Sequence, residues 1–87
     1  MIFRRMEDIL VERLDDQTLV FDPERNLPYV LNEVAAYILM NTDGETGQES
    51  VAGKVCEEFD VGFDQAFVDT KNLYEELALK KIVKRVD

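Results

Sequence analysis

The stretch YVLNEVAAYILMNTDG, from Tyr29 to Gly44, constrains the fold most, because it passes from a strand pattern into an apolar helix without a linker. The strand begins near Leu27, and Leu27, Tyr29 and Leu31 fall on one of its faces, since successive side chains of a strand point to opposite sides. Pro28 has no N–H to donate to a neighbouring strand. We therefore expect this strand at the edge of a sheet.

The helix in the same stretch carries its own start and stop signals. Asn32 is a good N-cap residue, and Glu33 places an acid in the first turn, where the helix dipole favours it. The segment Val34 to Met40 is apolar almost all round, so we expect the helix to be sandwiched between other elements. The pair Asp43-Gly44 is expected to end it.

Two further strands are predicted ahead of this one. The first runs from Asp8 to Leu14 and the second from Thr18 to Asp22, with the polar turn LDDQT between them. The sequence DPERN then predicts a type I turn, with Asp22 first and Pro23 second, where the fixed φ of proline is favoured. The short connections indicate three antiparallel strands.

Two more helices are predicted after the first. The second begins near Thr46, because Thr46 and Glu49 have the spacing of a capping box. Its apolar stripe consists of Val51, Ala52, Val55, Cys56 and Phe59. The third helix starts near Gly62 or Asp64 and ends near Lys81. The stripe along one of its sides consists of Phe63, Phe67, Thr70, Tyr74 and Leu77. The last segment, IVKRVD, is expected to form a short strand or to fray.

Strands followed by helices indicate an α+β fold. The 87 residues suffice for one small core, so we expect a single domain over residues 1–87, with three N-terminal antiparallel strands followed by three helices. A small sheet beside three short helices is winged helix-turn-helix-like in content. We also expect a cytoplasmic protein, because the chain has one cysteine, no secretory leader and no apolar run of about 18 residues.

The residues needed for most catalytic chemistry are missing. The chain has no histidine, and its single cysteine, Cys56, falls on the apolar stripe of the second helix, which favours a buried structural thiol over a nucleophile. Zinc and iron–sulfur sites need several thiolates or imidazoles. In NTDGETGQES, Leu39 and Ser50 would take the first and last ligand positions of a calcium loop, so this match fails. The sequence predicts no enzyme, no metal and no cofactor.

A binding role therefore fits better than catalysis, and the edge strand offers the surface. Its unpaired N–H and C=O groups could accept a second peptide as an added strand, whose side chains would need pockets. The third helix offers Phe67, Thr70, Lys71 and Tyr74. Phe67 and Tyr74 could equally be ordinary core residues, and Lys71 could be a solvated surface lysine.

Charge opposes one class of partner. The chain has 10 Lys and Arg against 19 Asp and Glu, and its net charge of −9 disfavours approach to the phosphates of nucleic acid. Two alternatives stay open: a winged-helix DNA-binding regulator, which would need a basic recognition helix, and a scaffold protein that pairs its edge strand with its own copy. A peptide adaptor is expected to be a monomer or a weak homodimer.

Three segments resemble the PqqD family, the small proteins of pyrroloquinoline quinone biosynthesis. They are LNEVAAYILMNTDG, ESVAGKVCEEFDV and LYEELALKKIV, which stand in the family's order and spacing within about Asp8 to Val83. The residues that carry the first match are Leu31, Asn32, Ala35, Ile38, Asp43 and Gly44. Gly47 and Gln48 replace the family's usual Thr or Ser and aliphatic residue, which shifts the expected cap of the second helix by one residue.

The resemblance implies a compact winged helix-turn-helix fold that recognises a ribosomally made precursor peptide. Such proteins bind the leader of that peptide as an added strand, in a groove between the third strand and the third helix. They present it to a radical S-adenosylmethionine enzyme in the quinone pathway, and related recognition domains serve other modified-peptide systems. By position, the residues of the groove would be Tyr29, Val30 and Leu31 on the strand, and Phe67, Thr70, Lys71 and Tyr74 on the helix.

Overall fold

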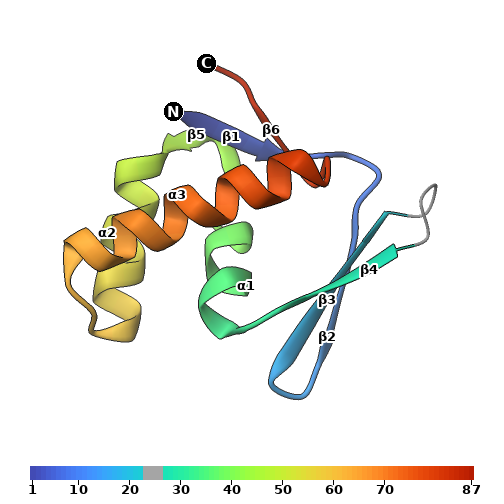
Figure 1. The fold of residues 1–87 in the computed structure, drawn as a ribbon, viewed down its shortest axis with the longest axis horizontal. Coiled ribbons are helices and arrows are strands. Elements are labelled where there is room, and N and C mark those ends of the chain that lie inside the picture. The colour runs from blue at the N-terminus through green and yellow to red at the C-terminus, as the bar shows by residue number, and fades with distance from the viewer. Residues whose placement is uncertain (23–26) are drawn as a thin grey trace.

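In the computed structural model, which describes residues 1–22 and 27–87, six strands and three helices are found (Figure 1). The strands are β1 (Ile2–Arg5), β2 (Leu10–Leu14), β3 (Gln17–Asp22), β4 (Leu27–Leu31), β5 (Asp43–Gly47) and β6 (Val83–Arg85). The helices are α1 (Glu33–Met40), α2 (Gln48–Phe59) and α3 (Phe63–Leu79). The α+β class is confirmed. The turn expected at Asp22 and Pro23 extends outside the described residues.

The three predicted strands form one antiparallel sheet in the order β2-β3-β4. The register pairs Val20 with Tyr29 and Thr18 with Leu31. Thr18, Val20 and Leu31 are buried, whereas every residue of β2 is exposed. Because β2 and β4 are the outer strands, the expectation that the Pro28 strand lies at an edge is confirmed.

A second sheet, in the order β5-β1-β6, joins the two ends of the chain, and most of it was not predicted (Figure 1). β1 lies in the middle, with Ile2 opposite Gly47 and Phe3 opposite Arg85. The short C-terminal strand is confirmed as β6. β1 and β5 have no expected counterpart, because their pairing partners lie far away in the sequence.

The segment between α1 and α2 corrects two predictions. α1 ends at Met40, with Asn41 as its C-cap, so Asp43 and Gly44 do not end the helix and instead begin β5. The capping box at Thr46 is also wrong: Thr46 lies in β5 and its hydroxyl donates to the Asp43 carboxylate at 2.9 Å. α2 begins one residue later than that cap implied, with Gly47 as an N-cap that has no side-chain bond.

The predicted N-cap of α1 and most of the predicted stripe of α2 are confirmed. The side chain of Asn32 accepts the N–H of Ala35 at 2.8 Å, as expected of the N-cap of α1. The apolar stripe of α2 contributes Val51, Ala52 and Val55 to the core. Cys56 is half-buried rather than buried, and its thiol donates to the carbonyl of Val61 at 2.8 Å.

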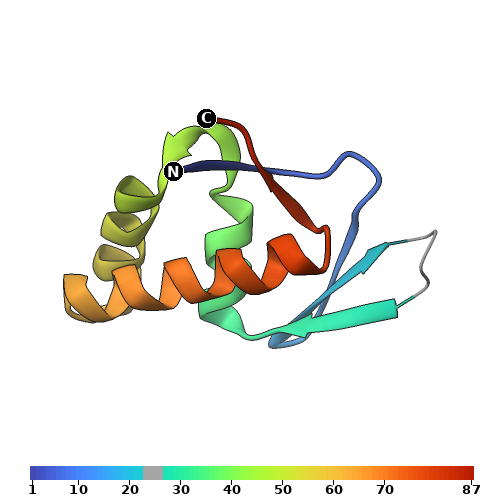
Figure 2. The ribbon, with the colours of Figure 1, turned by 45° about the horizontal axis from the view of Figure 1, so that its top comes forward.

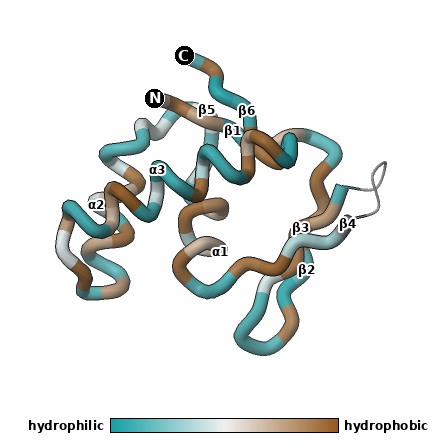
Figure 3. Tube along the Cα trace, viewed as in Figure 1, coloured by the Kyte–Doolittle hydropathy of each residue, from teal (hydrophilic) through white to brown (hydrophobic). Residues whose placement is uncertain are grey.

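α1 lies at the centre of the molecule. Figures 1 and 2 both place it between α2 on one side and the β2–β3–β4 sheet on the other, with α3 running across. It is apolar along most of its length, whereas polar and apolar residues alternate along α3 (Figure 3). Ile38 and Leu39 are fully buried and residues 34–37 are half-buried, which agrees with the sandwiched helix expected from the sequence. No helix within the described residues has the length and apolar character needed to cross a bilayer.

Candidate functional site

β4 presents an open outer edge. β3 occupies its inner edge, and no other described strand pairs with the outer one. The inward side chains are Tyr29, which is half-buried, and Leu31, which is 1% exposed. Pro28 and Val30 point the other way, and Val30 is 51% exposed. Backbone N–H and C=O groups along such an edge can pair with another extended chain.

The C-terminal half of α3 reaches β4 through Tyr29. The ammonium of Lys80 lies 4.8 Å from the centre of the Tyr29 ring, a cation–π distance. Partial burial, followed by a hydrogen bond to Glu76 and the negative charge of that carboxylate, raises the pKa of Tyr29 to about 12. The Tyr29 side chain therefore lies near Glu76 of α3 and Lys80, the C-cap of that helix.

A cavity of about 340 Å³ opens where β4 passes into α1. Its apolar wall comes from α1 and one residue of α3: Val34, Ala35, Ile38 and Leu73. Its polar wall consists of Asn32, Asp69, Asn72 and Glu76. Asp69 accepts a hydrogen bond from the Gln65 amide at 2.8 Å. No residue of β4 itself lines this cavity, which we call the β4 cavity because its wall begins at Asn32, the residue that directly follows β4.

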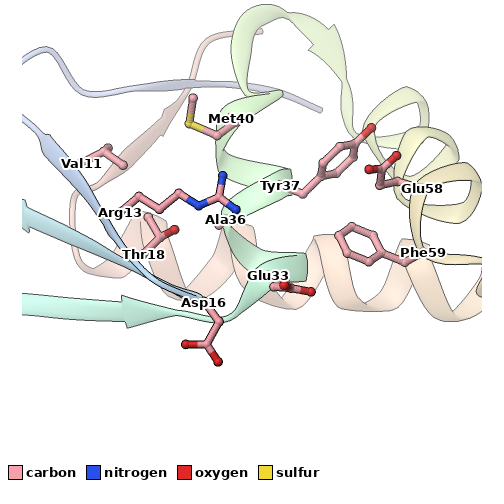
Figure 4. A pocket seen from close by; sticks show the side chains of 10 residues that line it. All are labelled: Val11, Arg13, Asp16, Thr18, Glu33, Ala36, Tyr37, Met40, Glu58 and Phe59. Carbon is pink, nitrogen blue, oxygen red and sulfur yellow. The ribbon is translucent and has the colours of Figure 1, made fainter.

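A second cavity, of about 460 Å³, lies on the other side of α1 (Figure 4). Figure 4 shows Arg13 reaching over α1 beside Ala36, with Tyr37 and Phe59 further along. The last two rings meet edge to face at 5.4 Å between centroids. The Arg13 cavity is the larger of the two but adjoins β2 and β3, not the outer edge of β4, so the β4 cavity is the better candidate for strand addition.

Two of the helix residues that the sequence singled out lie in the core. Thr70 is fully buried and its hydroxyl donates to the carbonyl of Ala66 at 2.7 Å. Tyr74 is 2% exposed, and its hydroxyl lies 2.7 Å from that of Thr42. Its ring stacks on Phe3 with centroids 4.4 Å apart. Both side chains therefore pack in the core and help to hold α3 against the rest of the fold.

The other two lie at the surface of α3 but outside the cavity. Phe67 is half-buried, with its ring centroid 6.0 Å from that of Phe63, and Lys71 is exposed. None of the four predicted helix residues lines the β4 cavity. The structure does place Tyr29, Val30 and Leu31 together along the edge strand, as the sequence predicted.

The residues of α3 that face β4 and the cavity were missed. They are Asp69, Asn72, Leu73 and Glu76, followed by Lys80 at the C-cap. Asp69, Leu73 and Glu76 each precede one residue of the buried stripe, Thr70, Tyr74 and Leu77, so they lie about 100° away around the helix. The signal available in the sequence was this second stripe, which mixes one apolar residue with charged ones.

Comparisons with known proteins agree with the resemblance seen in the sequence. Residues 17–83 match the family model described as coenzyme PQQ synthesis protein D (PqqD). A search of curated proteins finds no match.

Two solved structures are similar. One is described as lasso peptide synthetase B1 complexed with the leader peptide. It has a TM-score of 0.83 and 23% identity, and the match covers 97% of this chain and 99% of that one. The other is described as TbiB1 in complex with the TbiA(beta) leader peptide. It has a TM-score of 0.83 and 15% identity, with 97% and 98% covered. At these identities the two structures establish the shared fold, and the family match covers most of the chain. The chain therefore belongs to the PqqD family.

Proposed function

We propose that this protein is a non-catalytic peptide adaptor. It binds the leader of a ribosomally made precursor peptide as an added strand along the outer edge of β4, and it holds that peptide for a modifying enzyme. The observation that carries the proposal is the unpaired edge of β4, followed directly by the cavity that begins at Asn32 and lies between α1 and α3. Two proteins of the same fold are described as complexes with leader peptides, which supports it.

In strand addition, backbone groups provide the affinity and side chains provide the specificity. Backbone hydrogen bonds to β4 hold a peptide of almost any sequence, and pockets for alternate side chains give specificity. Val30 offers an exposed apolar contact on the edge itself. Tyr29 is fixed by Glu76 and Lys80 before a peptide arrives, which lowers the entropy lost on binding.

The partner enzyme and pathway form a finer part of the proposal. The family description names coenzyme PQQ synthesis, which supports a precursor of pyrroloquinoline quinone as the peptide and a radical S-adenosylmethionine enzyme as the partner. On this basis Tyr29, Val30 and Leu31 contact the leader from β4. On α3 the contacts come from Asp69, Leu73 and Glu76, while Thr70 and Tyr74 support the helix. Contact by Phe67 and Lys71 stays a prediction.

An NMR titration of isotope-labelled protein with the leader of the quinone precursor tests the proposal. We expect saturable shifts of backbone amides in Leu27–Leu31 and around Asn32, Leu73 and Glu76. Shifts that cluster on Phe67 and Lys71 would move the groove to the other side of α3. An absence of shifts at large peptide excess would remove this pathway.

Methylation of the peptide backbone tests strand addition itself. In an added strand, N–H groups alternate between facing β4 and facing away. We therefore expect N-methylation at alternate positions of the leader to abolish binding, and N-methylation at the intervening positions to leave it nearly unchanged. Equal effects at both sets of positions would exclude strand addition.

The two other candidate functions make different predictions. A DNA-binding regulator requires a steep fall in affinity for duplex DNA with salt, which the net charge of −9 opposes. A scaffold that pairs β4 with its own copy requires a mass that rises with concentration in light scattering. A protein that stays monomeric and does not bind duplex DNA would exclude both alternative functions.

A further inference from the structure

We propose that the β4 cavity selects a cationic side chain placed two residues from an aliphatic one in the bound peptide. This inference rests on the proposed function, because it assigns the chemistry of the peptide that the same site would take. It is carried by the make-up of the cavity walls and by the spacing of the residues along α3.

The apolar wall provides for the aliphatic side chain. Val34, Ala35 and Ile38 lie on one face of α1, and Leu73 faces them from α3. Ile38 is buried at 1% exposure, whereas the other three are half-buried, so the wall continues from the core to the surface. An aliphatic group placed here would remove apolar surface on both helices from water.

The polar wall of the cavity is acidic, and no basic residue on the wall balances its negative charge. Asp69 and Glu76 contribute two carboxylates, and no Lys or Arg lines this cavity. Asp69 accepts a hydrogen bond from the Gln65 amide, which is a neutral donor. Neither carboxylate forms an ion pair with a described residue.

One cation, Lys80, lies near the end of this wall, but it does not pair with either carboxylate. Lys80 follows Glu76 by one helical turn, and its ammonium sits over the Tyr29 ring rather than in an ion pair with Glu76. Asp69, two turns before Glu76, has no basic neighbour on the cavity wall. The wall thus carries negative charge that a lysine or arginine of a ligand would complement.

The spacing along α3 sets the pattern expected in the peptide. Leu73 lies four residues after Asp69 and three before Glu76, so the two carboxylates are displaced from it by about 6 Å and 4.5 Å along the helix axis. Side chains on one face of an extended peptide are two residues, or about 6.7 Å, apart. When an aliphatic side chain contacts Leu73, a Lys or Arg two residues away reaches Asp69 or Glu76.

Selection from a displayed library of random peptides, long enough to cover β4 and its cavity, tests the inference. We expect enriched sequences to carry Lys or Arg two residues from Leu, Ile or Val. Of the two variants Asp69→Asn and Glu76→Gln, the one that removes the carboxylate paired with the cation should weaken a selected peptide about fivefold, because it removes one partly exposed charge pair. Glu75→Gln is the matched control: it makes the same charge change on an exposed neighbour that does not line the cavity, and it should leave the affinity unchanged.

A double-mutant cycle between the peptide and the protein shows which carboxylate pairs with the cationic side chain. Replacing the cationic residue of a selected peptide by Gln should weaken binding to the wild-type protein and to Glu75→Gln, but not to the variant, Asp69→Asn or Glu76→Gln, that lacks its carboxylate partner. Enriched peptides that shift β4 amides but show no cationic preference, or that bind both Asp69→Asn and Glu76→Gln as tightly as wild type, would overturn this inference and leave the proposed function intact. A selection that enriches no peptide would overturn the proposed function, and the inference with it.

Discussion

At the residue scale, the buried pair of Thr42 and Tyr74 gives an asymmetric prediction. The Thr42 hydroxyl donates to the Ile38 carbonyl at 2.7 Å and also meets the Tyr74 hydroxyl. Tyr74→Phe leaves Thr42 bonded, so we expect it to lower the free energy of unfolding by about 1 kcal/mol. Thr42→Val leaves a buried phenol without its partner, and we expect a loss of about 2 kcal/mol.

Urea denaturation of both variants and of the double variant measures the effect. The double variant should lose less than the sum of the single ones, because the unpaired phenol is then absent. Equal losses in the two single variants, or strict additivity, would show that the hydrogen bond does not act as described.

Tyr29 offers a second test at this scale, because its pKa reports its contact with α3. Burial is the largest cause of the rise to about 12, and Glu76 adds to it through a hydrogen bond and its charge. We expect Glu76→Gln to lower the pKa of Tyr29 towards its ordinary value of 10.0 without reaching it. NMR titration of the ring carbon resonances measures this, and an unchanged pKa would place Glu76 away from the phenol.

At the scale of elements, β5 depends on the carboxylate of Asp43. This side chain accepts the N–H groups of Glu45 and Thr46 at 2.9 and 2.7 Å. These bonds, and one from the Thr46 hydroxyl, hold the pKa of Asp43 at about 2, below its ordinary 3.8. Since the folded-state pKa is lowered, the stabilisation is fully present above the unfolded value and is lost as the pH falls through the folded one.

The variant Asp43→Asn tests this pH dependence of stability. The variant does not titrate at this position, so we expect the difference in unfolding free energy between wild type and variant to shrink between about pH 5 and about pH 2. Asp87, whose pKa is also lowered to about 2, is present in both proteins and cancels. A difference that stays constant over this range would mean that the Asp43 bonds do not depend on its charge.

The elements also show which part of the fold the sequence could reveal. β2, β3 and β4 are joined by short connections, so their alternation and turn residues were enough to predict the sheet. β1 is four residues long and pairs with β5 and β6, which lie near residues 45 and 84. Asp43-Gly44 and Thr46-x-x-Glu49 are valid local signals for helix ends, and only the distant β1 makes that segment a strand.

The strand half of the candidate site could be predicted from the sequence, whereas the helix half could not, for a related reason. Pro28 marks an edge strand by its own chemistry, so Tyr29, Val30 and Leu31 could be placed from the sequence. On α3 the most apolar stripe attracts attention, and its Thr70, Tyr74 and Leu77 are buried in the core. The face beside β4 combines Leu73 with acids and a lysine, a mixture that resembles a solvated surface until the position of β4 is known.

At the scale of the whole molecule, charge repulsion should be measurable. The net charge is −9, and the ion pairs of Asp87 with the N-terminal ammonium and with Arg85 lie at exposed positions near the chain ends. We expect sodium chloride at about 0.5 M to raise the urea midpoint, because screening weakens the repulsion between carboxylates. Urea is the suitable denaturant since it adds no ions. A midpoint that falls with salt would show that attractive pairs dominate.

α1 forms a partition between two hollows. Val34, Ala35 and Ile38 face the β4 cavity, while Ala36, Tyr37 and Met40 face the Arg13 cavity. A helix of eight residues is about 12 Å long, and it moves as a rigid rod because its backbone bonds are internal. A ligand that displaced α1 sideways and widened one hollow would narrow the other. The two hollows are thus separated by the width of one short helix.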